Sequence, residues 1–281
     1  KIVASDFDQD GQDDLIVVGE WTTVGLFRNE SGKFRDLSAE NNLGLDKGWW
    51  FTIEETDVNN DDLPDYIIGN VGLNTKYKAS KEAPLKIFAD DFDDNGTWDI
   101  VLSSKYKDKY VPFRGKQCSS EQMPFITRKF PTYDKFAKAS LVDVYGERLN
   151  NAYQREVTEF RSVVLVNKGQ GQFEKRPLPM QAQLSPLLSC QSMDVNKDGF
   201  LDIVMAGNIY NTEVETPRFD AGTGSVLLSD GAGNFTIQNS QESGLYVDGN
   251  IKSMRQIQAG DSRYLLFGRN DSSLALVKLV H

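Results

Sequence analysis

Short runs of β-branched and other apolar residues recur along this chain, and each comes directly after a segment rich in aspartate. Four of these runs lie at residues 15–19, 66–70, 100–103 and 203–208. Gly, Asn or Ser bounds each run, as is typical of short buried strands. The pattern predicts an all-β fold built from a repeated unit.

A second pattern, Asn or Asp followed by Gly-x-Phe, occurs at residues 29–34, 167–173 and 230–235. Each copy follows an apolar stretch, so it predicts a β-hairpin with a glycine turn and an anchoring Phe on the return strand. The repeated unit is then an acidic loop, a buried strand, a second strand, a glycine turn and a third strand. A further repeat, which lacks the ligand pattern of the acidic loops, is predicted at residues 257–270.

The four acidic loops share the pattern D-x-[DN]-x-[DN]-G-x-x-D. Oxygen atoms at loop positions 1, 3, 5 and 9 converge if the chain curls at position 6, where Gly stands in three loops and Asp62 in the second. Ca²⁺ takes six to eight oxygen ligands, so we expect about four bound Ca²⁺ ions with structural roles. The expected side-chain ligands are Asp6, Asp8, Asp10, Asp14, Asp57, Asn59, Asp61, Asp65, Asp91, Asp93, Asn95, Asp99, Asp194, Asn196, Asp198 and Asp202. The backbone carbonyls at position 7 should complete each shell, from Gln12, Leu63, Thr97 and Phe200.

Other calcium motifs do not fit these loops. An EF-hand needs a bidentate Glu at position 12 and a helix on each side. Position 12 here is Val17, Ile68, Leu102 or Met205, inside the predicted strands. The G-G-x-G-x-D tandem of RTX β-rolls is also absent.

The loops and hairpins together resemble FG-GAP/VCBS repeats, the blades of integrin-α-type β-propellers. Residues 48–50, 69–74 and 207–215 are also similar to bacterial surface relatives of cartilage acidic protein, without an ASPIC/UnbV segment. The resemblance implies a calcium-binding β-propeller over residues 1–281, displayed at the cell surface by secretion or a lipid anchor. Its neighbours would be other domains of the same polypeptide or an outer-membrane complex. The resemblance implies no established activity.

The segment between the third and fourth loops has a different period. Tyr133, Phe136, Leu141 and Val144 fall at helical spacing, with Thr132 as the candidate N-cap. Further helices are predicted at residues 121–129 and 147–154. We therefore expect a mainly helical insertion at residues 105–160, which the propeller fold does not need. It is either a lid or docking element, or a decoration that covers apolar surface.

The charge and composition of the chain exclude some classes of binding partner. The formal charge is −10, from 31 basic and 41 acidic residues, and thirteen carboxylates stand at ligand positions. Four Ca²⁺ would therefore leave about −2, and the acidity is no sign of a basic partner. A sequence pI near 4.8 argues against nucleic-acid binding. No run of 18 apolar residues is present, so no membrane span is predicted.

Catalytic chemistry is sparse in this sequence. The one histidine is His281, which excludes Ser–His and Cys–His systems, and we assign no catalytic residue. Cys118 and Cys190 allow one disulfide or two thiols. The favoured function is a surface module that binds a protein or a glycan. The alternative is a glycan-active hydrolase or lyase that uses Glu213 and Glu215. Candidate ligand-binding residues are Trp49, Trp50, Glu213, Glu215, Arg218 and Asp220.

Overall fold

The computed structural model describes residues 1–41 and 43–280 and divides the chain into two compact units. The first unit combines Lys1–Lys76 with Phe160–His281, and the second is Tyr77–Glu159. His281, the one histidine, lies outside the described residues. Cys118 belongs to the second unit and Cys190 to the first, and both are thiols. Within the described part of the chain, no helix has the length and hydropathy to cross a membrane.

Four larger antiparallel sheets make up most of the described part of the first unit, and three of them have four strands. The first sheet contains β1 (Ile2–Ser5), β2 (Asp14–Val17), β4 (Gly25–Glu30) and β5 (Lys33–Asp36). The second contains β7 (Thr52–Thr56), β8 (Asp65–Gly69), β13 (Val163–Asn167) and β14 (Phe173–Pro177). The third contains β15 (Ser189–Met193), β16 (Asp202–Ala206), β17 (Ser225–Ser229) and β18 (Phe235–Gln238). The fourth contains β19 (Ile251–Ala259), β20 (Ser262–Arg269) and β21 (Ala275–Lys278).

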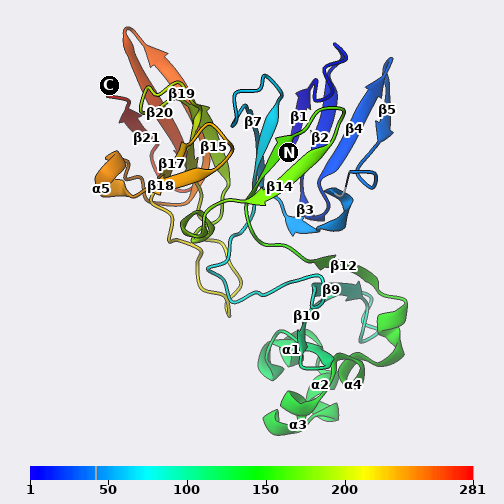
Figure 1. The fold of residues 1–281 in the computed structure, drawn as a ribbon. Helices are drawn as coiled ribbons and strands as arrows, with labels where there is room; N and C mark the ends of the chain where they lie inside the picture. The colour runs from blue at the N-terminus through cyan, green and yellow to red at the C-terminus, as the bar shows by residue number, and fades with distance from the viewer. Residues whose placement is uncertain (42, 281) are drawn as a thin grey trace. The chain divides into compact units, whose positions relative to one another are not determined.

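These sheets pack face to face in the order in which the chain forms them, from blue to red in Figure 1. Leu26 of the first sheet shares a core with Ile68 of the second, and Val164 of the second shares one with Leu227 of the third. Every residue of β8, β13 and β16 is buried, which explains their continuous apolar runs. The predicted all-β fold is confirmed. The described residues do not form a closed ring of sheets, so the propeller itself stays a prediction.

Short elements complete the first unit. The strands β3 (Glu20–Thr22) and β6 (Gly48–Trp49) pair as a separate ribbon. The helical turns are η1 (Leu43–Leu45), η3 (Met180–Gln183) and α5 (Ser240–Ser243). The predicted metal-free repeat is present as the β19–β20 hairpin.

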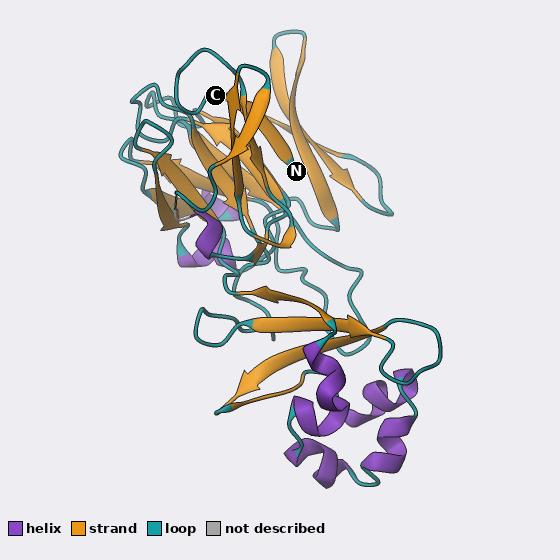
Figure 2. Ribbon diagram, turned by 90° about the vertical axis from the view of Figure 1, so that its right-hand side faces the viewer, coloured by secondary structure: helices purple, strands orange, loops and turns teal. Residues whose placement is uncertain are grey.

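The second unit has its own sheet and its own core. The sheet order is β11-β10-β9-β12, from β9 (Leu85–Asp90), β10 (Asp99–Tyr106), β11 (Lys109–Pro112) and β12 (Tyr153–Val157). The helical elements are α1 (Lys116–Gln122), α2 (Phe125–Lys129), α3 (Tyr133–Lys138), α4 (Leu141–Tyr145) and η2 (Gly146–Asn150). Figure 2 shows the helices grouped beside these strands. Phe88, Phe92, Ile126, Leu141 and Val144 share the core.

The unit extends further than the insertion expected at residues 105–160. It begins at Tyr77 and includes the third acidic loop, because β9 pairs with both β10 and β12. The predicted helix at residues 147–154 is instead a 3₁₀ turn followed by β12, whose pairing with β9 prevails over the local pattern. The predicted cap is present, since Thr132 Oγ1 accepts a hydrogen bond of 3.3 Å from the Lys135 amide.

Candidate metal centres

The aspartate at position 1 closes each acidic loop by accepting backbone hydrogen bonds. Asp6 accepts from the amides of Asp10 (3.0 Å) and Gly11 (2.9 Å), and Asp91 accepts from Asn95 (2.9 Å) and Gly96 (2.8 Å). The residue at position 6 has a positive φ in all four loops, including +63° at Asp62. Position 4 also has a positive φ in every loop, which the sequence pattern did not indicate.

The aspartate at position 9 is buried in every loop and ties the loop to another part of its unit. Asp65 Oδ2 accepts from the Val58 amide (2.9 Å), and its Oδ1 accepts from the Asn167 amide (2.7 Å). Asp14 and Asp202 accept in the same way from the amides of Asn29 (2.7 Å) and Ser229 (2.9 Å). Position 9 therefore joins each loop of the first unit to the hairpin of its own sheet.

Burial shifts the titration of these carboxyl groups. Desolvation raises the pKa of Asp65 to about 6, although two backbone N–H donors act against it. It also raises the pKa of Asp14, Asp99 and Asp202, and neighbouring loop carboxylates contribute in the same direction. A bound cation would favour the ionised forms and relieve this repulsion.

The donor atoms fit a hard cation. Carboxylate oxygens of Asp6, Asp8 and Asp14 lie within 4.8 Å of one another, and those of Asp91, Asp93 and Asp99 do the same. The second and fourth loops carry an asparagine at position 3 instead of a third close carboxylate.

Three loops also contain a buried ligand oxygen without a hydrogen-bond partner. These atoms are Asp14 Oδ2, Asn59 Oδ1 and Asp93 Oδ1, at positions 9, 3 and 3. Buried acceptors are normally satisfied, so each of these oxygens needs a donor or a cation. The observed donor set contains only oxygen, which Ca²⁺ prefers.

Arginine side chains contact two of the loops. Arg28 Nε lies 2.8 Å from Asp8 Oδ2, and Arg28 Nη2 lies 3.5 Å from Asp10 Oδ2. In the second unit, Arg148 pairs with Asp94 at 2.5 Å and donates to the Asp91 carbonyl. These guanidinium groups offset part of the carboxylate charge, and Arg28 contacts oxygens that a cation in the first loop would use.

The residue at position 2 is a second anchor that the sequence analysis did not single out. Phe7, Val58 and Phe92 are at most 5 % exposed, and each belongs to a hydrophobic core. An apolar residue between the first two ligand positions was visible in the sequence. Its role depends on the packing of sheets, which the local pattern does not specify.

The Phe7 and Val58 carbonyls bind the hairpin of the following sheet. Asn167 Nδ2 donates to the Phe7 carbonyl (2.8 Å), while the Asn167 amide donates to Asp65 of the second loop (2.7 Å). Ser229 Oγ donates to the Val58 carbonyl (3.3 Å), while the Ser229 amide donates to Asp202 of the fourth loop (2.9 Å). We call these two connections the loop bridges. They join the three loops of the first unit in series.

The two tryptophans that were candidate ligand contacts lie in different environments. Trp50 is 2 % exposed, and its Nε1 donates to the Thr22 carbonyl (3.0 Å), so it is a core residue and not a ligand contact. Trp49 is half-buried and packs against Trp21 and Phe160, with ring centroids 5.3 and 4.9 Å away. Trp50 follows the last residue of β6, and the Trp49 ring is covered in part by its two aromatic neighbours.

The polar candidates lie on the connection that follows β16. Glu213 Oε1 accepts from Thr216 Oγ1 (2.9 Å) and lies 3.5 Å from Lys76 Nζ, an arrangement that orders the connection. Glu215 and Asp220 are exposed. Arg218 lies over the Tyr210 ring at 5.1 Å and lines a polar hollow that also includes Asn211. Of the four polar candidates, only Arg218 lines this hollow.

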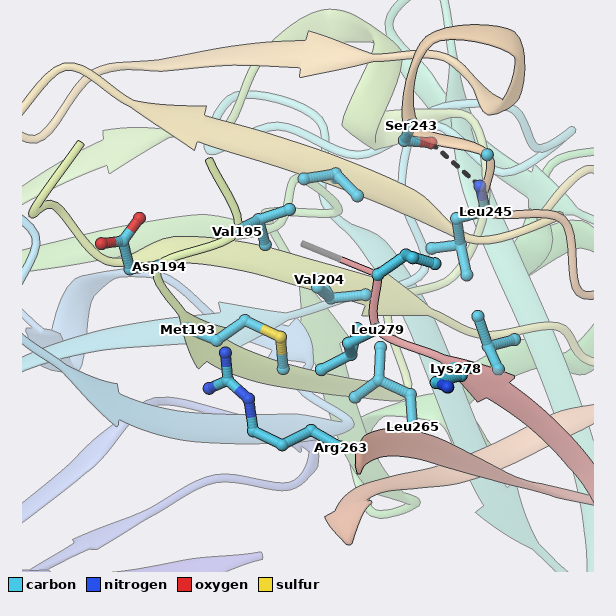
Figure 3. Close-up of a pocket in the computed structure, with 14 residues that line it drawn as sticks. Met193, Asp194, Val195, Val204, Ser243, Leu245, Arg263, Leu265, Lys278 and Leu279 are labelled. Carbon is cyan, nitrogen blue, oxygen red and sulfur yellow. Dashed lines mark hydrogen bonds between the residues drawn. The ribbon is translucent and has the colours of Figure 1, made fainter. Parts of the chain in front are cut away.

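A second hollow, of about 260 Å³, lies between the third and fourth sheets (Figure 3). Val204, Leu245, Leu265 and Leu279 supply apolar lining, and Asp194 of the fourth loop lies at its border. Most of these apolar residues belong to the core that joins the two sheets. We therefore regard this hollow as a continuation of that core.

Comparison with known protein families finds a match for one segment of the chain. A family model described as FG-GAP-like repeat matches residues 6–68, from the first aspartate of the first loop to β8. A search of the curated proteins found no match. The resemblance to FG-GAP repeats is therefore confirmed, and the matched segment contains the first two acidic loops.

Proposed function

We propose that this protein is a calcium-stabilised binding or adhesion module that acts outside the cell or at its surface. The main support is the recurrence of one loop geometry, with a buried aspartate at position 9 of all four loops and a partnerless ligand oxygen in three of them. The match of residues 6–68 to an FG-GAP-like repeat also supports a role as a binding module. The partner class is a protein or a glycan.

Calcium would act here on folding rather than on chemistry. Extracellular modules bind Ca²⁺ at about 10⁻⁴ to 10⁻³ M. At about 1 mM calcium and the tighter end of that range, each site adds about 1.4 kcal/mol to the free energy of unfolding. Four sites would add about 5–6 kcal/mol, against a total of about 5–15 kcal/mol for a typical domain. The ions would therefore stabilise the surface on which a partner binds.

The test compares melting temperatures in excess chelator, in about 1 mM Ca²⁺ and in Mg²⁺. We expect Ca²⁺ to raise the melting temperature reversibly, and Mg²⁺ to do so poorly because it demands a tighter octahedral shell. The Asp14→Asn variant should lose about a quarter of the calcium-dependent gain. An asparagine can keep the acceptor that binds the Asn29 amide while replacing the partnerless oxygen with an amide.

A matched control is available in the same loop. Asp13 is exposed and stands at position 8, which is not a ligand position, so Asp13→Asn changes the charge equally without removing a ligand. This variant should keep the full calcium response. If the melting temperature of the parent protein is the same with and without calcium, after metal removal is verified, the proposed role of calcium is wrong.

A further inference from the structure

We propose that the polar hollow between the connections of the third and fourth sheets binds an acidic sugar residue, a uronic acid, of a glycan. This inference rests on the proposed binding function and names its ligand class. The hollow has a volume of about 390 Å³, inside the range of about 300–1,000 Å³ that is usual for small-molecule sites.

Three separate connections form this hollow. Tyr210 and Arg218 come from the connection after β16, Asp248 and Asn250 from the one before β19, and Arg269 and Asp271 from the end of β20. The fourth acidic loop precedes β16, whereas Tyr210 and Arg218 follow it. The hollow therefore lies at the opposite end of that strand from the metal centre, and its ligand need not contact the cation.

The walls of the hollow are held in place by a buried asparagine. Asn208 is 1 % exposed, and its Nδ2 donates to the carbonyls of Gly222 (2.8 Å) and Gly249 (2.7 Å). Its Oδ1 accepts from the Gly222 amide (2.9 Å). These bonds fix two of the three connections before a ligand arrives, which lowers the entropy cost of binding.

Asn250, which lines the hollow, has a buried side-chain acceptor without a partner. Asn250 is 4 % exposed, and its Oδ1 makes no hydrogen bond with the described protein atoms. The backbone carbonyl of Asn250 accepts a hydrogen bond from the Asn270 amide (2.9 Å), so only the side-chain oxygen of Asn250 lacks a donor. A buried acceptor of this kind favours a ligand that brings an O–H or N–H donor.

The two arginines of the hollow differ in what they offer. Arg269 is only 17 % exposed, and its guanidinium donates to the Ser273 carbonyl (2.9 Å) and to Asp248 (3.3 Å). Arg218 is exposed, stacks on Tyr210, and forms no ion pair with the residues that the structure describes. Arg218 is therefore the cation available to a ligand carboxylate, which a guanidinium can bind through two parallel hydrogen bonds.

These groups together favour an acidic sugar over simpler ligands. An inorganic anion such as sulfate carries no donor for Asn250. A neutral sugar would satisfy Asn250 but leave Arg218 without an anion. The lining is polar apart from the Tyr210 ring, so it lacks the apolar pocket in which peptide anchors usually bind. A uronic acid supplies both hydroxyl donors and one carboxylate.

The experiment uses the methyl glycosides of glucuronic and galacturonic acid, titrated into the calcium-loaded protein and followed by backbone amide NMR. The methyl glycosides of glucose and galactose are the neutral controls. We expect at least one acid to bind about tenfold more tightly than its neutral counterpart and to shift the amides of Gly249, Asn250 and Asn270. Equal binding of acids and neutral sugars, or no binding of any, would overturn the proposal.

Two variants test the assignment of Arg218. Arg218→Ala should weaken binding of the acid about tenfold or more, and Arg218→Glu should abolish it. The control is Arg35→Ala, which removes an exposed arginine from β5 and should leave binding unchanged. Loss of binding in Arg35→Ala to the same extent would contradict the assignment. So would competition by sodium sulfate as strong as by the acid, or tighter binding of an aspartate-rich peptide to the same residues.

The outcome is separable from that of the calcium experiment. Asp14→Asn at saturating Ca²⁺ and below its melting temperature should still bind the acidic sugar, because the first loop does not line the hollow. If calcium stabilises the protein but no sugar binds, only the glycan inference fails. If the sugar binds and calcium has no effect on melting, only the proposed role of calcium fails.

Discussion

The aspartate at position 9 shows how one side chain serves two opposed requirements. Asp65 is fully buried and accepts two backbone hydrogen bonds, which favour its charged form. Desolvation and the nearby Asp57 and Asp61 oppose ionisation and prevail, so the pKa rises to about 6. A metal ion at the loop would reverse this balance. The residue therefore links folding, protonation and metal binding.

This residue makes the metal-free protein sensitive to pH. The folded-state pKa of Asp65 lies above its ordinary value of 3.8, so the folded state binds the proton more tightly than the unfolded state. In chelator, the free energy of unfolding should therefore fall as the pH rises from about 4 through 6, by about 3 kcal/mol at most from this residue. Asp14 and Asp202 act in the same direction.

Urea unfolding at intervals between pH 4.5 and 7 measures this slope. Carboxylates with a lowered pKa, such as Asp36, are ionised in both states over most of this window and contribute little. Saturating Ca²⁺ should remove or reverse the slope, because the metal selects the ionised carboxylates. A free energy of unfolding that rises with pH in chelator would contradict the prediction.

At the scale of elements, the loop bridges make neighbouring sheets depend on one another. Asn167 stands at the end of β13, donates its amide to the second loop and its side chain to the first. Ser229 stands at the end of β17 and does the same for the fourth and second loops. The stability of one loop therefore depends partly on a hydrogen bond from a residue in another sheet.

Asn167→Ala should lower the free energy of unfolding by about 1–3 kcal/mol, because the buried Phe7 carbonyl loses its side-chain donor. The substitution should also weaken calcium binding at the first loop. Calcium titration of the parent protein and of the variant measures this effect. The control is Asn29→Ala, since Asn29 holds the equivalent place in the first sheet. Its Oδ1 accepts from Gly32 as that of Asn167 does from Gly169, but its Nδ2 reaches only its own loop. Equal effects of the two substitutions would show that the bridge has no energetic role.

At the scale of the whole molecule, the chain leaves the second sheet after β8, builds a separate unit, and returns to the same sheet at β13. The second unit has its own sheet and its own core. Val163–Leu165 of β13 pair directly with Tyr66–Ile68 of β8 despite the intervening unit. The second sheet can therefore be completed without residues of the second unit.

Replacing Tyr77–Glu159 with a Gly/Ser linker of about six residues should leave a folded first unit. The Gly72 amide donates to the Phe160 carbonyl (2.9 Å), so a short linker can join the cut ends. The variant should unfold cooperatively and keep its calcium-dependent gain in melting temperature. Replacing residues 105–160 with the same linker should give a less cooperative unfolding transition, because that deletion removes β12 and leaves β9 without this partner. Loss of cooperative unfolding in the first variant would contradict the independence of the units.

Local patterns predicted the parts of this molecule that depend on neighbouring residues. The acidic loops, the buried strands and the glycine hairpins each lie within about ten residues of sequence, so their side-chain periods specify them. The pairing of β9 with β12 joins residues far apart, and it moved the start of the second unit to Tyr77. The burial of Trp50 and the presence of Arg218 and Asn250 in the lining of one hollow depend on how sheets pack, which no local pattern encodes.

The pairing of Leu85 with Val157, which joins the first and last strands of the second unit, has a consequence for the kinetics of folding. Before that unit folds, residues 70–162 form one open loop of 93 residues between β8 and β13 (162 − 70 + 1). Once it folds, only the segments at residues 70–84 and 158–162 remain to be closed. The shorter closure costs about 1–1.5 kcal/mol less in chain entropy. During synthesis all strands of the first sheet emerge before the second unit, whereas the second sheet cannot form until β13 has emerged. The folded second unit then brings β8 and β13 of the second sheet close together.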